Sequence, residues 1–255
     1  MNLKDRIAVV TGGASGLGEA CVRDLLKCGA KIAIFDFAAD RGKEIAEKLG
    51  KNVIFVKTDV TDEEGVRTAI SKTMDAFGAI HIVINCAGTG DAIKVYSKRG
   101  PYPLDLFTRV VQINLVGTFN VIRLAVEQMI KNTPSEEGEK GVIINTASVA
   151  AYDGQIGQAA YSASKAGVVG MTLPIARECA EYGIRVMTVA PGIFDTPLLS
   201  QLPEKARESL GKMVPFPPRL GRPDEFAVLA RHIIENTMLN GEVIRLDGAI
   251  RMAAR

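Results

Sequence analysis

The feature that most constrains the fold is a regular alternation of strand-length apolar runs with helical patterns. The runs are continuous and rich in Val and Ile, as expected of parallel strands covered on both faces. Such an order along a whole chain favours a doubly wound α/β fold with right-handed crossovers. We expect about seven strands, at residues 7–10, 31–35, 53–57, 80–84, 142–145, 184–189 and 242–246.

Several predicted helices carry end signals. Thr61 to Glu64 has the pattern of a capping box that opens a helix ending near Phe77. Gly50 stands where a glycine ends a helix over 38–49. Pro223, followed by two acidic residues, predicts a helix to about residue 235. Longer helices are expected around 104–131 and 158–180.

Composition restricts the classes of protein. With 255 residues, 47% of them hydrophobic, the chain fits a single domain over residues 1–255. A net charge of +2 does not indicate a nucleic-acid surface. No run of about 18 apolar residues predicts a membrane span. The four cysteines and two histidines form no metal motif, so we expect no metal site and a cytoplasmic protein, with the mitochondrial matrix as the alternative for a eukaryotic source.

Two long segments interrupt the alternation, at residues 89–104 and 195–218. Both follow the carboxyl ends of predicted strands, where open α/β sheets bind ligands. We expect them to be substrate loops rather than tolerated insertions. They carry basic side chains that either contact phosphates of a substrate or are simply solvated: Lys94, Lys98, Arg99, Lys205, Arg207 and Lys212.

A glycine-rich turn joins the first strand to the first helix. Its spacing is Gly-x-x-x-Gly-x-Gly, which differs from the general dinucleotide fingerprint and is a weak signal alone. Its place before a helix strengthens it, because amides at a helix start favour a pyrophosphate. The residues expected to bind the dinucleotide here are Gly12, Ser15, Gly16, Leu17 and Gly18.

The carboxyl ends of the next strands supply further cofactor candidates. Asp36 lies 18 residues after Gly18, where a carboxylate accepts hydrogen bonds from the ribose hydroxyls of NAD and repels the phosphate of NADP. We therefore expect NAD. Asp59 and Val60 end the third strand and are expected at the adenine. Small residues after the fourth strand let a ribose pass closely: Cys86, Ala87 and Gly88.

Tyr161 and Lys165 are four residues apart in a predicted helix, so their side chains share one face. A phenol holds its proton until about pH 10, and a nearby ammonium lowers that pKa. Ser148 follows an apolar run and can present a hydroxyl beside the phenol. This spacing is also a common accident on helices, so the pair alone is weak evidence for chemistry.

Together these motifs resemble the short-chain dehydrogenase/reductase family over almost the whole chain. The resemblance rests on the glycine turn, Asp36, Asn114, Ser148 and Tyr161-x-x-x-Lys165 in this order. It is closest to the type II 3-hydroxyacyl-CoA dehydrogenases, also described as type 10 17β-hydroxysteroid dehydrogenases. The stretches that carry this are residues 117–124, 141–151, 154–165 and 241–252.

The resemblance implies a Rossmann-type sheet and a role for each site residue. Tyr161 is the acid/base, Lys165 lowers its pKa and binds the nicotinamide ribose, and Ser148 holds the substrate oxygen. Asn114 binds a water that leads protons from Lys165 to solvent. Gln155 is a candidate substrate contact. The nicotinamide carboxamide is expected at Pro191, Gly192, Phe194 and Thr196.

The implied function is NAD-dependent interconversion of a 3-hydroxyacyl-CoA and a 3-oxoacyl-CoA, in a homotetramer. Three alternatives stay open: a hydroxysteroid or other secondary-alcohol dehydrogenase, a 3-oxoacyl carrier-protein reductase, and a non-catalytic NAD sensor. Asp36 argues against the carrier-protein reductase, because biosynthetic reductases mostly use NADPH. The loop over 92–104 departs most from the family, so acyl chain length, branching, steroid acceptance and physiological direction stay open.

Overall fold

The expected strands form one seven-stranded parallel sheet, which confirms the predicted fold class. The structure is a computed structural model and describes residues 1–200 and 203–254. The strand order is β3-β2-β1-β4-β7-β8-β9. The chain adds strands outward from β1 to β3, returns to the centre, and then adds β4, β7, β8 and β9 on the other side of β1, as in a doubly wound fold. The strands are β1 (Ile7–Thr11), β2 (Lys31–Asp36), β3 (Val53–Lys57), β4 (Ile82–Asn85), β7 (Gly141–Thr146), β8 (Ile184–Pro191) and β9 (Val243–Leu246).

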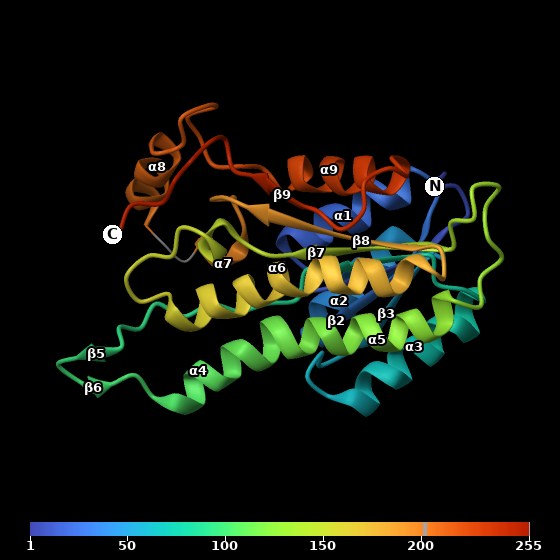
Figure 1. Cartoon of the computed structure of the whole chain (residues 1–255), viewed down its shortest axis with the longest axis horizontal. Coiled ribbons are helices and arrows are strands. Elements are labelled where there is room, and N and C mark those ends of the chain that lie inside the picture. The colour runs from blue at the N-terminus through green and yellow to red at the C-terminus, as the bar shows by residue number, and fades with distance from the viewer. Residues whose placement is uncertain (201–202, 255) are drawn as a thin grey trace.

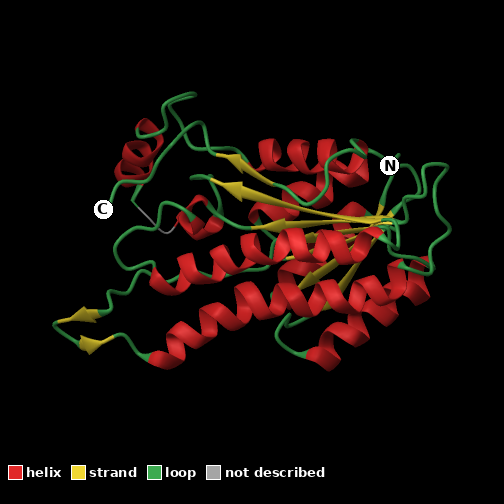
Figure 2. Cartoon of the chain, in the orientation of Figure 1, coloured by secondary structure: helices red, strands yellow, loops and turns green. Residues whose placement is uncertain are grey.

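Helices cover both faces of the sheet (Figure 2). One face packs against α1 (Gly16–Lys27), α2 (Ala39–Leu49) and α9 (Pro223–Glu235). The other packs against α3 (Glu63–Phe77), α5 (Gly117–Met129) and α6 (Ala159–Ala180).

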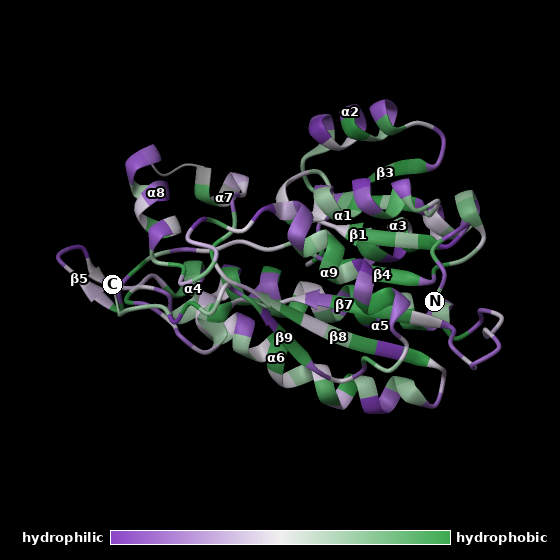
Figure 3. Cartoon of the chain, turned by 90° about the horizontal axis from the view of Figure 1, so that it is seen from above, coloured by the Kyte–Doolittle hydropathy of each residue, from purple (hydrophilic) through white to green (hydrophobic). Residues whose placement is uncertain are grey.

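Successive residues of one strand enter different cores. Ala8 and Val10 of β1 face the α1 side, and Val9 between them faces the α5 side, all fully buried. The central strands are accordingly apolar along their length (Figure 3). Each fully buried Val or Ile side chain contributes about 1.5–3 kcal/mol, which explains the continuous Val/Ile runs.

One helix begins differently from the expectation. The capping box predicted at Thr61 is wrong, because α3 begins after Asp62 and no side chain caps it. Both the backbone N–H and the hydroxyl of Thr61 instead donate to the Asp59 carboxylate, at 2.9 and 2.7 Å. Thr61 therefore closes a local turn after β3 and does not satisfy the helix. The predicted start of α9 at Pro223 is confirmed.

The predicted helix around 104–131 is a continuous helix with a wide turn in its middle. It comprises α4 (Leu104–Val111), a π-helical segment (Gln112–Val116) and α5. By length and composition alone it could cross a membrane, but half of its most apolar stretch is buried inside the protein. Core helices of folded proteins meet the same criterion. Within a helix, π-segments are frequent at functional sites.

Both predicted substrate loops leave the carboxyl end of the sheet. Segment 89–104 contains a short antiparallel hairpin, β5 (Tyr96–Ser97) and β6 (Gly100–Pro101). Segment 195–218 contains α7 (Pro197–Ser200) and α8 (Glu204–Lys212), and its residues 201–202 lie outside the described part. Figure 1 places the hairpin, α8 and the C-terminus at one end of the molecule, opposite the N-terminus.

His81 gives the fold a pH dependence. Its Nδ1 accepts a hydrogen bond from Ile7 N at 3.2 Å, and burial, assisted by Arg6, lowers its pKa from 6.5 to about 4. The unfolded chain therefore binds a proton at a higher pH than the folded chain. Stability that is present above pH 6.5 is lost as the pH falls toward 4. For this half-buried ring we expect a loss of about 2 kcal/mol.

The test is urea unfolding at pH 7.5 and 4.5 of the wild type and of His81→Asn, whose amide oxygen can still accept from Ile7. The variant should lose about 2 kcal/mol less than the wild type over this interval. Equal losses in the two proteins would show that His81 does not carry this dependence.

Candidate active site

Tyr161 and Ser148 meet at the carboxyl end of β7. Ser148 follows this strand at the start of a short 3₁₀ turn (Val149–Ala151), and its Oγ accepts a hydrogen bond from Ala150 N at 3.1 Å. Tyr161 lies in the first turn of α6, and its phenol is close enough to the Ser148 hydroxyl for that hydroxyl to lower the pKa of the phenol. The predicted pair is thus assembled, with Ser148 almost buried and Tyr161 half-buried.

The expected lowering of the Tyr161 pKa by Lys165 is not observed. Burial raises the pKa of the phenol, and the hydrogen bond from Ser148 partly offsets this. The Lys165 Nζ lies 5.8 Å from the centroid of the Tyr161 ring and donates to Thr146 O at 2.8 Å, so its charge faces a backbone carbonyl. The phenol accordingly keeps its proton at neutral pH and is ready to donate it.

Lys165 is a buried ammonium with 5% of its surface exposed. Burial lowers its pKa from 10.5 to about 8. A Cβ built on Gly88 would lie 3.5 Å from its Nζ and 3.1 Å from Asn114 Oδ1, so the chain after β4 passes close to both side chains. A lysine so desolvated and placed beside a tyrosine is typical of a functional site.

Asn114 is buried in the π-helical segment, beside Lys165. Its Nδ2 donates to Thr89 O and Ser164 Oγ at 2.8 and 3.0 Å, and its Oδ1 accepts from Thr89 N at 2.8 Å. The side chain thus holds the segment that follows Gly88. The observed hydrogen bonds of the Asn114 amide are to Thr89 and Ser164. The expectation that Asn114 binds a water stays a prediction.

The glycine turn has the geometry that its motif predicts. Gly12 and Gly16 have positive φ angles of 63° and 52°. A Cβ on Gly18 would lie 2.2 Å from Gly12 O, so the turn can close on the helix only with glycine there. Ser15 is the N-cap of α1, but its side chain makes no cap hydrogen bond. The first amides of α1, including that of Leu17, are therefore the free donors that a pyrophosphate would use.

Asp36 ends β2 beside this turn. Its Oδ2 accepts from Ala14 N at 3.0 Å and its Oδ1 from Ala38 N at 2.9 Å. Each carboxylate oxygen retains a second acceptor position for a ribose hydroxyl. Arg41, five residues further along the chain, pairs with Glu19 at 3.1 Å.

The ends of β3 and β4 match the expected cofactor path to different degrees. Asp59 is exposed and uses one oxygen for Thr61, and Val60 is buried. Cys86 Sγ lies 3.4 Å from Thr146 Oγ1, and Cys86 packs against the core that contains Cys21, so its contacts fit packing. Ala87 directly precedes Gly88 in the segment that passes Lys165.

The stretch after β8 faces the glycine turn. A Cβ on Gly16 would lie 3.5 Å from Thr196 Cβ, and Gly192 N donates to Leu246 O at 2.9 Å. Pro191, the last residue of β8, is buried. Phe194 packs in the core against Gly221, which places its ring away from solvent.

Among the candidate substrate contacts, two are engaged within the protein. Gln155 Nε2 donates to Ala253 O at 3.0 Å. Arg207 of α8 pairs with Asp195 at 2.6 Å. The sequence had suggested a substrate contact for Gln155 and a phosphate contact for Arg207, and both expectations remain untested.

Sequence reasoning missed residues that hold the site together. The Thr11 hydroxyl accepts from Cys86 N and Ala87 N at 3.1 and 3.0 Å, which ties β1 to β4. Ser164 Oγ donates to Tyr161 O at 2.7 Å and accepts from Asn114. A threonine directly before the glycine turn is a usable sequence signal. The Thr146 carbonyl that binds Lys165 has no signal, because every residue has one.

These features fit a dinucleotide laid across the sheet at the reversal of strand order. The helix amides suit the pyrophosphate, the half-buried Asp36 suits a ribose, and the glycine at 88 leaves room for a second ribose next to Lys165. Among the described residues, no cluster of three or more His, Cys, Asp or Glu suits a metal ion.

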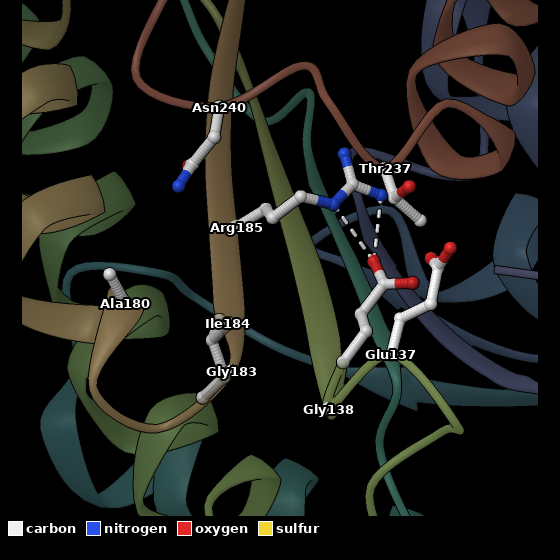
Figure 4. Close-up of a pocket in the computed structure, with 9 residues that line it drawn as sticks. Glu137, Gly138, Ala180, Gly183, Ile184, Arg185, Thr237 and Asn240 are labelled. Carbon is white, nitrogen blue, oxygen red and sulfur yellow. Dashed lines mark hydrogen bonds and ion pairs between the residues drawn. The ribbon is translucent and has the colours of Figure 1, made fainter.

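A cavity of about 280 Å³ lies at the amino end of β8, away from the carboxyl ends of the strands (Figure 4). Arg185 reaches across it from the start of β8. Its guanidinium pairs with Glu139 at 2.7 Å and donates to four carbonyls: Ile233 O, Ile234 O, Asn236 O and Leu239 O. All its donors are used, so the group stabilises the end of α9 and offers no ligand contact.

Comparisons with known proteins agree with this geometry. A family model described as short chain dehydrogenase matches residues 6–207. A 3-hydroxyacyl-CoA dehydrogenase type-2 from Drosophila melanogaster is 54% identical over 252 residues, 98% of this chain and 99% of that protein. The protein of that name from Homo sapiens is 55% identical over 253 residues, 98% and 97% of the two chains. The crystal structure of 3-hydroxyacyl-CoA dehydrogenase type-2 from Mycobacterium avium has a TM-score of 0.94 at 41% identity and covers 100% of both chains.

Proposed function

The chain belongs to the short-chain dehydrogenase family, and we propose that it is an NAD-dependent oxidoreductase that interconverts a 3-hydroxyacyl-CoA and a 3-oxoacyl-CoA. The observation that carries the proposal is that the Ser148 hydroxyl, the Tyr161 phenol and the buried Lys165 ammonium lie together at the carboxyl end of β7. The names of relatives that are 54–55% identical over 98% of the chain support the substrate class.

In the reducing direction, Tyr161 donates its proton to the substrate oxygen. A nicotinamide bound next to this pair would supply the hydride for the carbonyl carbon. Ser148, next to the phenol, donates its single hydroxyl hydrogen to the same substrate oxygen and orients it. The Lys165 ammonium, 5.8 Å from the centroid of the Tyr161 ring, supplies a positive charge near the phenolate that forms. In the oxidising direction the phenolate takes the hydroxyl proton, and the same groups act in reverse.

The buried lysine predicts an alkaline limit to carbonyl reduction. Its pKa is about 8, so it is charged below that pH and loses its charge above it. Without this charge the phenolate is less stabilised, and kcat/KM for reduction should fall about tenfold per pH unit once the lysine is mostly neutral. A pH profile from 6 to 10 at saturating NADH measures this. A profile that stays flat to pH 10 would contradict it, and in Lys165→Arg the alkaline limb should move above pH 10.

We propose NAD over NADP because of Asp36. Both of its oxygens are held by backbone amides, which fixes a negative charge at the ribose position, and Arg41 is already paired with Glu19. A 2′-phosphate would be repelled there. This also disfavours the carrier-protein reductase.

The experiment that tests the function follows NADH absorbance with acetoacetyl-CoA, the matching carrier-protein thioester, a ketosteroid and simple ketones, each also with NADPH. The proposal expects NADH oxidation with the CoA thioester at the highest kcat/KM. A higher value for a steroid or simple ketone would replace the substrate class. No oxidation with any carbonyl, despite NADH binding, would favour a non-catalytic sensor.

We further propose a homotetramer in a reducing compartment, the cytoplasm or, for a eukaryotic source, the mitochondrial matrix. Large apolar side chains on α5 and α6 are exposed, Phe119 at 48% and Leu173 at 43%, which suits burial against further copies. All four cysteines are free thiols. Light scattering tests the assembly, and a monomer at micromolar concentration would refute it.

A further inference from the structure

Arg245 connects the turn that follows Ser148 to the C-terminal segment, residues 247–254. It lies in the edge strand β9, opposite Ala190 of β8. Its Nη2 donates to Asp153 Oδ2 at 2.5 Å and its Nη1 to Asp153 Oδ1 at 3.4 Å. Its Nε donates to Asp247 at 2.8 Å, and its guanidinium lies 5.3 Å from the centroid of the Tyr152 ring. The guanidinium therefore joins Asp153 to Asp247, which are far apart in sequence.

Backbone hydrogen bonds connect Asp153 to Ser148. The Ser148 carbonyl accepts from Ala151 N at 3.0 Å, and the Val149 carbonyl accepts from Tyr152 N and Asp153 N at 2.9 and 2.8 Å. With the bond from Ala150 N to Ser148 Oγ, these contacts make residues 148–153 one compact turn. A displacement of Asp153 is thus transmitted to the hydroxyl that touches Tyr161.

The C-terminal segment also contacts Arg245 and the loop that follows Asp153. Arg245 Nη2 also donates to Ile250 O at 3.1 Å. Ala253 O accepts from Gln155 Nε2, and Ala254 O accepts from Ile156 N, both at 3.0 Å. Gly157 O accepts from Ile93 N at 2.9 Å, so the loop after Asp153 is held between the C-terminal segment and the segment that leads to the hairpin.

We infer that Arg245 is a positioning residue for the proposed reaction: its bidentate salt bridge to Asp153 holds the Ser148 hydroxyl next to the Tyr161 phenol. The inference rests on the proposed function of that pair. The charges match this role, because the hydrogen bond from Arg245 lowers the pKa of Asp153, which is therefore ionised throughout the neutral range. Arg245 touches neither Tyr161 nor Lys165 in the described contacts, so it acts through Asp153.

The test compares Arg245→Met, Arg245→Lys, Asp153→Asn and Asp153→Glu, using the best carbonyl substrate of the wild type. A small misplacement of a reacting group costs up to about 100-fold. We expect kcat to fall about 10- to 100-fold in Arg245→Met and about tenfold in Asp153→Asn, with the Kd for NADH unchanged. Asp153→Glu should retain most activity. Because both partners act through one contact, the double variant should be no slower than Arg245→Met.

Arg231 and Asp24 are a matched control pair. They join α9 to α1 at 3.0 Å, are similarly half-buried, and lie outside the site. Arg231→Met should leave kcat within about twofold of the wild type. In Arg245→Met, deuterated NADH should give a larger isotope effect on kcat, because hydride transfer becomes slower. Loss of folded protein alone would not change this isotope effect.

Two failures are distinguishable. A wild type that turns over no carbonyl substrate refutes the proposed function. If the wild type is active but kcat is unchanged in folded Arg245→Met and Asp153→Asn, or if kcat falls only as NADH binding falls, Arg245 does not position Ser148. Should Arg245→Met fail to fold, kcat and the Kd for NADH of Asp153→Asn and Arg245→Lys distinguish the same two outcomes.

Discussion

Replacing Tyr161 with phenylalanine should lower kcat by about 10²- to 10⁴-fold, the contribution typical of a general acid or base. The phenol is the proton donor in the proposed reduction, and burial keeps it protonated at neutral pH. Phenylalanine retains the ring against which Gly90 passes, where a Cβ would lie 3.3 Å from the Tyr161 ring. The cofactor path should therefore persist, and the Kd for NADH, measured by fluorescence, should change by less than about twofold.

Tyr182→Phe is the matched control, because Tyr182 is a 42% exposed phenol just beyond the far end of α6. It should leave kcat unchanged. Turnover by Tyr161→Phe within about threefold of the wild type would show that another group moves the proton. Loss of NADH binding in step with turnover would show instead that the substitution damages the cofactor site.

Replacing Asp36 with alanine should lower the ratio of kcat/KM for NAD to that for NADP by about 100-fold. Hydrogen bonds to a charged group contribute about 1.5–3 kcal/mol each, and two at the low end account for this factor. The same change removes the acceptor of Ala14 N in the glycine turn, so the KM for NAD should also rise. Steady-state kinetics with both cofactors measure the ratio.

Asp40→Ala serves as the control, since Asp40 is an exposed carboxylate four residues further along the chain. Its NAD/NADP ratio should match the wild type. An unchanged ratio in Asp36→Ala would mean that another group contacts the ribose. The exposed Asp59 would be the next residue to substitute.

Most of the fold could be predicted from the sequence because the central strands are buried on both faces. In β1 every residue is buried, so the pattern shows as an unbroken apolar run. Helix ends were less predictable. The signal at Thr61 resembled a capping box, but the nearby Asp59 carboxylate competes for the same hydroxyl and amide. Local sequence does not reveal which acceptor prevails.

The candidate site was predictable where chemistry demands a particular side chain. Tyr161, Lys165, Ser148 and Asp36 carry groups that few other residues supply. The contacts that arrange them were not predictable, because Lys165 and Asn114 bind backbone groups of Thr146 and Thr89. The direction of the Tyr161 pKa was missed for a related reason. Helical spacing indicates that two side chains share a face, but it does not reveal burial or where the ammonium points.

The most direct test of the account is single-turnover transfer from NADH with deuterium at both positions of the nicotinamide C4, with acetoacetyl-CoA as acceptor. The predicted product is 3-hydroxybutyryl-CoA with one deuterium on C3 and a solvent-derived proton on its oxygen, formed by the wild type and at least about 10²-fold more slowly by Tyr161→Phe. Mass spectrometry measures the deuterium content of the product and the rate at which it forms. NADH that binds without transferring its deuterium to any carbonyl, or transfer at equal rates in both proteins, would contradict the proposed role of Ser148, Tyr161 and Lys165.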